Sequence, residues 1–236
     1  MALPTELGRP RSPFLLINPK AYLTGAAIKG FAIVADGLAA ELDVDVVFTA
    51  QHVDLAAIAG ATTNLIVAAQ HLDPMGYGRG MGHILPEGVV QAGARAVVLN
   101  HAEHPLSLGE LDAAMRRAEE VGLTTIVCAD SIRQCRAVAQ LDPAIVICEP
   151  TVNIGTGVMA VDDYICESTA AVKAVNPDIL VVQGAGVGTG ADVTRMIRLG
   201  ADAAGTSSGL INADDRSFAL RGMIEAVAQL RDERGV

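Results

Sequence analysis

The sequence predicts an α/β protein in which eight parallel strands, each followed by a helix, close into a single-domain (β/α)8 barrel. Three observations support this fold class. Short apolar runs alternate with amphipathic helical stretches along the chain, which is the pattern of parallel strands joined by crossover helices. The 236 residues are 51% hydrophobic and 19% charged, so one large core can be buried. Aromatic residues make up only 3%, which favours a core of Ala, Val, Ile and Leu such as fills a small barrel.

The elements follow one another from the N-terminus. Residues 1–12 contain prolines and no periodicity, so we expect a flexible, loosely attached arm, followed by a barrel domain over residues 13–236. The apolar runs predict strands near 13–18, 44–49, 65–69, 95–100, 123–128, 144–148, 179–183 and 202–206. The helical patterns lie near 26–42, 86–92, 107–122, 131–140, 161–175, 189–199 and 214–232. Ser107 and Glu110 have the spacing of a capping box at the start of one helix.

An open, doubly wound sheet is the competing architecture, because it shows the same alternation of strands and helices. Such a sheet usually has fewer strands and often has a glycine-rich turn after the first one. Here the first turn is Asn18-Pro19-Lys20, and glycines gather late, at 184–190 and 205–209. The closed barrel is therefore favoured.

Polar residues of catalytic type follow the first, fourth and sixth predicted strands. They are Lys20, His101 and Glu149. The carboxyl ends of barrel strands converge on one mouth, where the active sites of such barrels lie. A cation, an imidazole and a carboxylate at that mouth can move a proton beside a carbonyl group. A lone histidine or glutamate after a strand can equally be structural, so the prediction depends on the three occurring together.

Charge and composition exclude several other classes of function. The formal net charge of −10 argues against nucleic-acid binding, which uses clustered Lys and Arg. No apolar run approaches about 18 residues and no signal-peptide pattern is present, so we expect a soluble cytoplasmic protein without membrane contacts. The four cysteines have neither CxxC nor zinc-type spacing and are interpreted as small hydrophobes. No HxH or HExxH spacing supports a metal site.

Seven ordered segments of the sequence resemble the triosephosphate isomerase family, and specifically its shorter, archaeal-type branch. The resemblance covers nearly the whole chain. It lies in Ile17-Asn18-Pro19-Lys20, Ala69-Gln70-His71-Leu72-Asp73-Pro74, Gly82-His83-Ile84-Leu85-Pro86-Glu87, Leu99-Asn100-His101-Ala102-Glu103, Cys148-Glu149-Pro150, Ile154-Gly155-Thr156-Gly157 and Gly184-Ala185-Gly186. It implies an isomerase that interconverts dihydroxyacetone phosphate and D-glyceraldehyde 3-phosphate through an enediolate, with no metal or organic cofactor.

The resemblance also implies roles for the polar residues after the strands. Glu149 is expected to be the general base, and His101 the electrophile that donates a hydrogen bond to the carbonyl oxygen. A helix amino terminus after His101 would keep the ring neutral, an effect for which this family is itself the well-known example. Lys20 is expected to stabilise the enediolate charge and Asn18 to bind substrate oxygens. Glu103 would orient Lys20 through an ion pair, although a glutamate after a strand is also common as a plain surface residue.

The family positions place the phosphate of the substrate on backbone N–H groups of the late glycine-rich loops. Residues expected there are Ile154, Gly155, Gly186, Ser207 and Ser208. Together with Asn18 and Lys20, they form the predicted substrate-binding and phosphate-binding set. Turn glycines without the catalytic residues would be interpreted as structural.

Two further segments carry expectations from the resemblance. Residues 150–157 resemble a lid, in which Val152 and Ile154 would cover the substrate and exclude water. The loop near 72–82, with Met75, Tyr77 and Met81, has the apolar content to contact a second subunit, and the family implies a homodimer or homotetramer.

Four features depart from the family pattern. Met81 replaces a small polar residue, Ala102 and Gly188 each replace a serine, and the segment after the lid is shorter. These changes leave open an alternative substrate, such as the four-carbon ketose phosphate erythrulose phosphate. A barrel that binds a phosphorylated metabolite without turning it over is a second alternative, and a purely structural barrel is a third.

Overall fold

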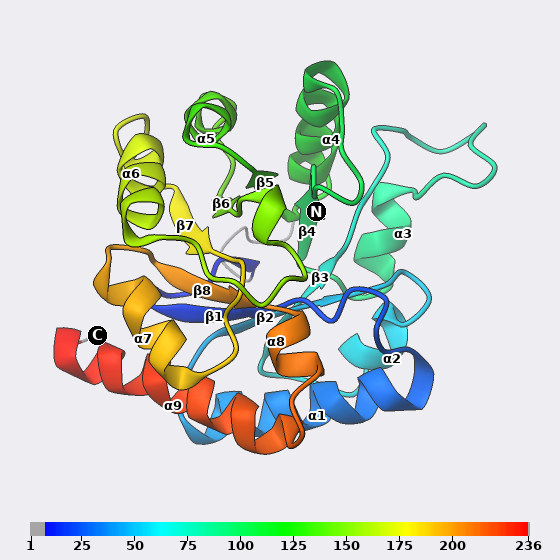
Figure 1. Cartoon of the computed structure of the whole chain (residues 1–236). Helices are drawn as coiled ribbons and strands as arrows, with labels where there is room; N and C mark the ends of the chain where they lie inside the picture. The colour runs from blue at the N-terminus through cyan, green and yellow to red at the C-terminus, as the bar shows by residue number, and fades with distance from the viewer. Residues whose placement is uncertain (1–7, 236) are drawn as a thin grey trace.

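The computed structural model describes residues 8–235, which form a closed barrel of eight parallel strands surrounded by helices (Figure 1). The strands are neighbours in the order of the sequence, and β8 pairs with β1 to close the sheet. Their bounds are Phe14–Ile17 (β1), Val46–Ala50 (β2), Leu65–Ala69 (β3), Ala96–Leu99 (β4), Thr124–Ala129 (β5), Ile145–Cys148 (β6), Leu180–Gln183 (β7) and Ala203–Thr206 (β8). The predicted fold class is confirmed, and each strand lies within two residues of its predicted bounds.

The helices follow the predicted pattern with two additions. Their bounds are Gly25–Glu41 (α1), Leu55–Ala59 (α2), Pro86–Gln91 (α3), Leu108–Glu120 (α4), Ile132–Ala139 (α5), Asp162–Lys173 (α6), Gly190–Arg198 (α7), Ser208–Ile211 (α8) and Arg216–Arg234 (α9). The sequence did not predict α2 and α8, because helices of four or five residues are too short to show a helical period. The capping box of Ser107 and Glu110 is confirmed at the start of α4.

The barrel buries apolar side chains in two layers, because successive residues of a strand point to opposite faces of the sheet. One layer fills the barrel interior with small and branched side chains such as Leu16, Val98 and Ile147. The other lies between the strands and the helices and includes Ile17, Val97 and Val146. Both faces are therefore dry, which is why the strands are continuous apolar runs and do not alternate with polar residues.

The described part of the predicted N-terminal arm lies against the barrel. Gly8 and Pro10 are buried, and the Arg11 guanidinium pairs with Asp43 at 2.9 Å and with Asp45 at 2.6 Å. Residues 1–7 of that prediction lie outside the described residues. Within residues 8–235, no helix is both long enough and apolar enough to cross a membrane.

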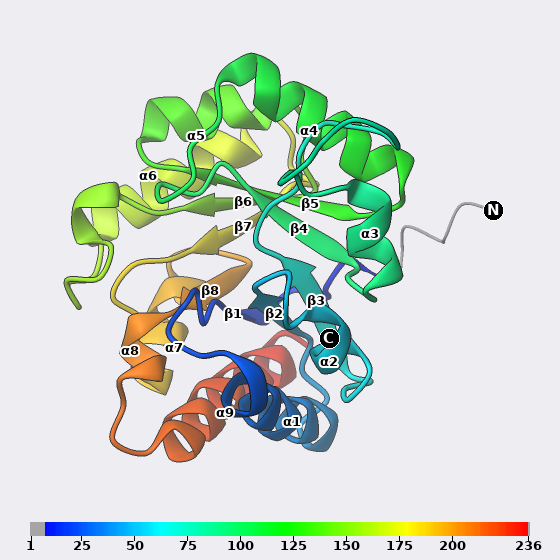
Figure 2. The same cartoon turned by 90° about the vertical axis from the view of Figure 1, so that its right-hand side faces the viewer.

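All eight strands run in the same direction, so the segments that follow them gather at one end of the barrel. Figure 2 shows the β6–α6 segment and α8 together at that end, on the left of the view. This geometry brings residues from distant parts of the sequence to one mouth.

Candidate active site

Glu149 directly follows β6 and points into the mouth of the barrel. Its Oε1 atom accepts a hydrogen bond from the backbone N–H of Ala185 at 3.0 Å, and only 18% of its side chain is exposed. Burial raises the pKa of this carboxyl above its ordinary value, while the charge of Lys20 acts in the opposite direction. A carboxylate with a raised pKa is a better proton acceptor than an exposed one.

His101 follows β4 and is held in one protonation state by its own turn. Its Nδ1 atom accepts a hydrogen bond from the backbone N–H of Glu103 at 3.1 Å, so in the neutral ring the proton must be on Nε2. Burial, and then the charge of Lys20, lower the pKa of His101. A neutral ring was expected from the start of the following helix, but α4 begins only at Leu108. The hydrogen bond instead comes from the tighter turn before that helix.

Asn100 shapes that turn. Its backbone is left-handed, with a φ of 58° that asparagine tolerates better than most residues. Its side-chain amide donates to the carbonyl of Cys128 at 3.0 Å and accepts from the N–H of Leu106 at 3.0 Å. The amide therefore fastens the turn to β5 and fixes the direction of the His101 ring.

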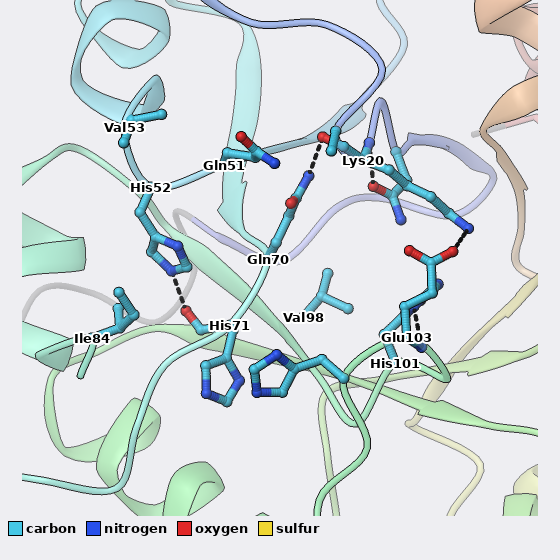
Figure 3. Close-up of a pocket in the computed structure, with 13 residues that line it drawn as sticks. Lys20, Gln51, His52, Val53, Gln70, His71, Ile84, Val98, His101 and Glu103 are labelled. Carbon is cyan, nitrogen blue, oxygen red and sulfur yellow. Dashed lines mark hydrogen bonds and ion pairs between the residues drawn. The ribbon is translucent and has the colours of Figure 1, made fainter. Parts of the chain in front are cut away.

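Lys20 lies across the mouth from these residues. Its Nζ atom is 2.5 Å from Glu103 Oε1, and Figure 3 shows the two side chains pointing at one another. The ion pair expected between them is therefore present. The Oδ1 atom of Asn18 accepts from the N–H of Lys20 at 3.0 Å and from the hydroxyl of Thr49 at 2.7 Å. Since Oδ1 is occupied twice, the amide N–H groups of Asn18 are the ones left to meet a ligand.

The proton-transfer groups face one another across a narrow gap. His101 Nε2 lies 3.9 Å from Glu149 Oε2, which is too far for a hydrogen bond, so neither atom satisfies the other. Within residues 8–235, the buried Nε2 atom has no hydrogen-bond partner. A buried donor without a partner is costly, so this N–H is suited to a carbonyl oxygen.

The residues expected to bind phosphate line the same cavity as Asn18, Lys20, His101 and Glu149. They are Ile154, Gly155, Gly186, Ser207 and Ser208. The buried hydroxyl of Ser207 has no hydrogen-bond partner in the described chain. This hydroxyl and the N–H groups at the start of α8 can meet an anion, although α8 is too short to contribute a full helix dipole.

Gly186 is needed at its position for two reasons. Its φ is +74°, and a Cβ atom there would lie 2.6 Å from both the nitrogen of Met159 and the carbonyl carbon of Val158. A side chain would therefore displace the backbone that follows the lid. Only glycine allows the loop after β7 to pack this closely.

A larger cavity of about 540 Å³ opens beside Lys20 and Glu103 and was not foreseen from the sequence. Figure 3 shows Gln51, His52, Gln70 and His71 on its walls. The side-chain amide of Gln70 donates to the carbonyl of Lys20 at 3.1 Å, which supports the left-handed backbone of that lysine, with φ 47°. Gln70 and Thr49 were missed as supporting residues, because polar residues at strand ends give no signal of which atom they contact. Within residues 8–235, no group of three or more His, Cys, Asp or Glu is arranged to hold a metal ion.

The expected lid begins with a single 3₁₀ turn, Thr151–Asn153. Ile154 lines the active-site cavity, whereas the side chain of Val152 is 85% exposed and covers nothing in this conformation. Glycines with positive φ stand at 155 and 157, near the C-terminal end of the lid.

Comparison with known proteins identifies the family. The family model for triosephosphate isomerase matches residues 13–227. The triosephosphate isomerase of Methanobacterium bryantii is 36% identical over 92% of this chain and 97% of its own. The chain belongs to the triosephosphate isomerase family. The resemblance that the sequence indicated, including its archaeal character, is thereby confirmed.

Further members of the family agree with this assignment. The triosephosphate isomerase of Methanosarcina mazei is 33% identical over 92% of this chain and 99% of its own. The crystal structure of triosephosphate isomerase from Bartonella henselae superposes with a TM-score of 0.72 over 91% of this chain and 98% of its own. Since only 16% of residues are identical in that pair, the superposition supports the fold alone.

Proposed function

We propose that this protein interconverts dihydroxyacetone phosphate and D-glyceraldehyde 3-phosphate without a cofactor. Membership of the triosephosphate isomerase family supports the reaction. The observation that carries the proposal is the pairing of a buried carboxylate and a neutral imidazole, 3.9 Å apart, on one cavity with a lysine. The reaction needs a base, a hydrogen-bond donor and a stabilising charge around one carbonyl group.

The proton transfer begins at Glu149. Its carboxylate removes a proton from the carbon beside the substrate carbonyl and returns it to the former carbonyl carbon. His101 donates its Nε2–H to the carbonyl oxygen, where negative charge develops as the enediolate forms. It then takes the proton of the neighbouring substrate hydroxyl, so that one oxygen gains a proton, the other loses one, and the imidazole ends neutral. A neutral imidazole suits this role. Because Nδ1 accepts the hydrogen bond from the N–H of Glu103, the single ring proton is on Nε2, which faces the cavity. Lys20 stabilises the same charge and Asn18 binds the substrate oxygens.

The phosphate is held at the opposite side of the cavity. Backbone N–H groups at Gly155, Gly186 and Ser208, together with the hydroxyl of Ser207, bind its oxygens without adding a cation there. Since the protein carries a net charge of −10, attraction for an anion must be local. Lys20 supplies that attraction between the phosphate and the reacting carbons.

The first test is a coupled assay of the purified protein with each triose phosphate, run beside Glu149→Gln. We expect rapid interconversion by the wild type and a loss of several orders of magnitude in the variant, because the amide cannot accept the proton. Glu149→Asp is the matched comparison, since it keeps a carboxylate and moves it by about one bond length. We expect it to lose about a hundredfold in rate and so to remain more active than Glu149→Gln. Absence of turnover by the wild type would overturn the proposal.

The alternative substrates find less support. The relatives from Methanobacterium bryantii and Methanosarcina mazei are named triosephosphate isomerases, so erythrulose phosphate and a non-catalytic binding role are not favoured. The same assay with erythrulose phosphate measures the remaining difference. A higher kcat/KM on the four-carbon substrate than on the triose phosphates would reverse the assignment.

We further propose that the protein is a homodimer or homotetramer built through the loop at 72–82. This loop projects from the barrel between β3 and α3 (Figure 1), with Met81 fully exposed and Tyr77 73% exposed. Several contacts keep it in shape. Among them, Asp73 N–H donates to the carbonyl of Ile84 at 3.0 Å, and Arg117 Nε donates to the carbonyl of Met75 at 3.0 Å. The 540 Å³ cavity beside Lys20 can receive such a loop from a second copy.

Light scattering after gel filtration tests this assembly. We expect the mass of at least two chains for the wild type, and a shift toward one chain for Tyr77→Glu combined with Met81→Glu. A monomeric wild type at micromolar concentration would contradict it.

A further inference from the structure

The lid is connected to the rest of the barrel through one side chain that no role assigned above includes. Most hydrogen bonds of residues 150–157 stay within the segment or reach Val158 beside it. Within residues 8–235, the two that reach another element both end on Asp130. Its Oδ1 accepts from the N–H of Thr151 at 3.1 Å, and its Oδ2 accepts from the Thr151 hydroxyl at 2.9 Å.

Asp130 is itself held in place from two sides. It directly follows β5, and its N–H donates to the side-chain oxygen of Gln134 on α5 at 3.2 Å. Its carbonyl accepts a hydrogen bond from the hydroxyl of Tyr164 on α6. The carboxylate therefore starts from a fixed backbone, and both of its oxygens are directed at Thr151, the second residue of the lid.

Thr151 is a sensitive point at which to hold the chain. It stands two residues after Glu149 and is separated from it only by Pro150, whose ring restricts the backbone. The orientation of the catalytic carboxylate and the pivot of the lid therefore both depend on the position of Thr151. A displacement of a catalytic group by about 1 Å can cost about a hundredfold in rate.

We propose that Asp130 is a positioning residue, which fixes the base of the lid so that Glu149 stays aligned while the rest of the segment closes over the substrate. This inference rests on the proposed isomerase function. Asp130 touches no reacting atom in this arrangement and acts through Thr151. When the base of the lid is loose, the enediolate is exposed to water more often and loses its phosphate.

Asp130→Asn and Thr151→Val test the proposal. Asparagine keeps the shape of Asp130 but offers a single accepting oxygen, and valine keeps the shape of Thr151 but lacks the hydroxyl. We expect each to lower kcat about tenfold and to raise the phosphate released per isomerisation about tenfold. Thr151→Ser keeps both hydrogen bonds and should match the wild type. Melting temperature and circular dichroism establish that the variants are folded.

The partition between isomerisation and phosphate release separates positioning from simple damage. A fall in kcat at unchanged phosphate release per isomerisation, in folded variants, would overturn the proposal. So would a Thr151→Ser variant as impaired as Thr151→Val.

A second measurement does not need turnover. The sequence contains no tryptophan, so Val152→Trp places a single fluorescent probe at an exposed position of the lid, next to Thr151. We expect lower fluorescence anisotropy when Asp130→Asn is added to this variant, because the lid loses one of the two hydrogen bonds that tie Thr151 to residue 130. Equal anisotropy in Val152→Trp with and without Asp130→Asn would overturn the proposal that Asp130 holds the lid. If the wild type did not isomerise triose phosphates at all, the proposed function would fail while this measurement still decided the role of Asp130.

Discussion

The two halves of the proposed active site are built from different parts of the chain. The proton-transfer half consists of side chains, namely Lys20, His101 and Glu149, each placed at the end of a strand. The phosphate half consists mainly of backbone, in the loops that contain Gly155 and Gly186 and at the start of α8. Both halves line one cavity, yet they depend on the sequence in opposite ways.

The two halves differ in what a substitution does: it removes a chemical group from one and adds colliding atoms to the other. In the first half a substitution removes a chemical group and leaves the fold, since β4 and β6 are buried on both faces without it. In the second half a substitution adds atoms where the backbone of another segment already lies, as at Gly186. The first half should therefore respond in kcat, and the second in KM and in the geometry of the lid.

In the proton-transfer half, the largest effect after that of Glu149→Gln is expected for His101→Gln. Glutamine can still donate a hydrogen bond, but its amide lies at a different position and cannot relay a proton. We expect kcat to fall about a hundredfold to a thousandfold, as for loss of one preorganised donor, with KM changed far less. Steady-state kinetics in both directions of the reaction measure this, with Glu149→Gln alongside.

A fall confined to KM would show that His101 binds substrate without assisting the chemistry. The melting temperature should stay close to that of the wild type, because the two hydrogen bonds of Asn100 still fasten the turn when the bond from the N–H of Glu103 to the imidazole is lost.

In the phosphate half, Gly186→Ala should raise KM about tenfold with a smaller change in kcat. Its Cβ would lie 2.6 Å from the backbone of Val158 and Met159, and φ is +74°, so the loop after β7 must shift. Gly188→Ala is the matched control, since a Cβ there meets nothing closer than 3.8 Å. Kinetics of both variants and inhibition by inorganic phosphate supply the measurement.

Similar KM values for the two variants would remove the distinction between the halves. They would show that the close packing of Gly186 against Val158 and Met159 does not affect phosphate binding. A loss confined to kcat at Gly186→Ala would assign that glycine to lid motion instead.

The same contrast explains what could be predicted from the sequence. The eight strands were predictable because both of their faces are buried, so each is an apolar run bounded by polar or turn-forming residues. Lys20, His101 and Glu149 could be selected as candidates because their residue types at strand ends are chemically distinctive, and the structure brings the three to one cavity. Family resemblance then indicated the role expected of each.

Other parts of the site carried no such signal. The proton position on His101 depends on the backbone N–H of Glu103 in a tight turn. Every residue except proline has such an N–H, so the sequence does not indicate this contact. The short α8 has too few residues for periodicity. The link between Asp130 and Thr151 spans 21 residues of sequence and two elements, so only the folded arrangement reveals it.

The pH dependence of activity sharpens the account of the proton-transfer half. Glu149 must be ionised to act as a base, and burial raises its pKa above the ordinary 4.5. We expect kcat/KM to fall about tenfold per pH unit on the acid side, below that raised pKa. Protonation of His101 should not lower kcat/KM near pH 6.5, because burial and the charge of Lys20 lower the pKa of its ring. Profiles between pH 4.5 and 8 test this, with Lys20→Met expected to move the acid limb upward. An acid limb that stayed in place in Lys20→Met would contradict the proximity of the two charges.

The smallest expected effect is on stability, and it compares a functional group with the fold that carries it. Because the pKa of Glu149 is raised in the folded protein, the folded state binds this proton more tightly than the unfolded state does. The bound proton on Glu149 therefore stabilises the folded state. This contribution is complete below the pKa of Glu149 in the unfolded state and is lost as pH rises through its pKa in the folded state. At pH 7.5 the wild type therefore bears the cost of a buried carboxylate that Glu149→Gln lacks. The amide can still accept from the N–H of Ala185.

We expect urea unfolding to show Glu149→Gln more stable than the wild type by on the order of 1 kcal/mol at pH 7.5. The two proteins should converge near pH 4, where Glu149 is protonated in both its folded and unfolded states. A variant less stable than the wild type at pH 7.5 would mean that attraction to Lys20 outweighs the loss of hydration. In that case the carboxylate would be held as part of a structural ion pair, and its strength as a base would need another explanation than burial. A stability gain together with the loss of turnover would instead show that the barrel keeps a destabilising charge at its mouth because the reaction requires it.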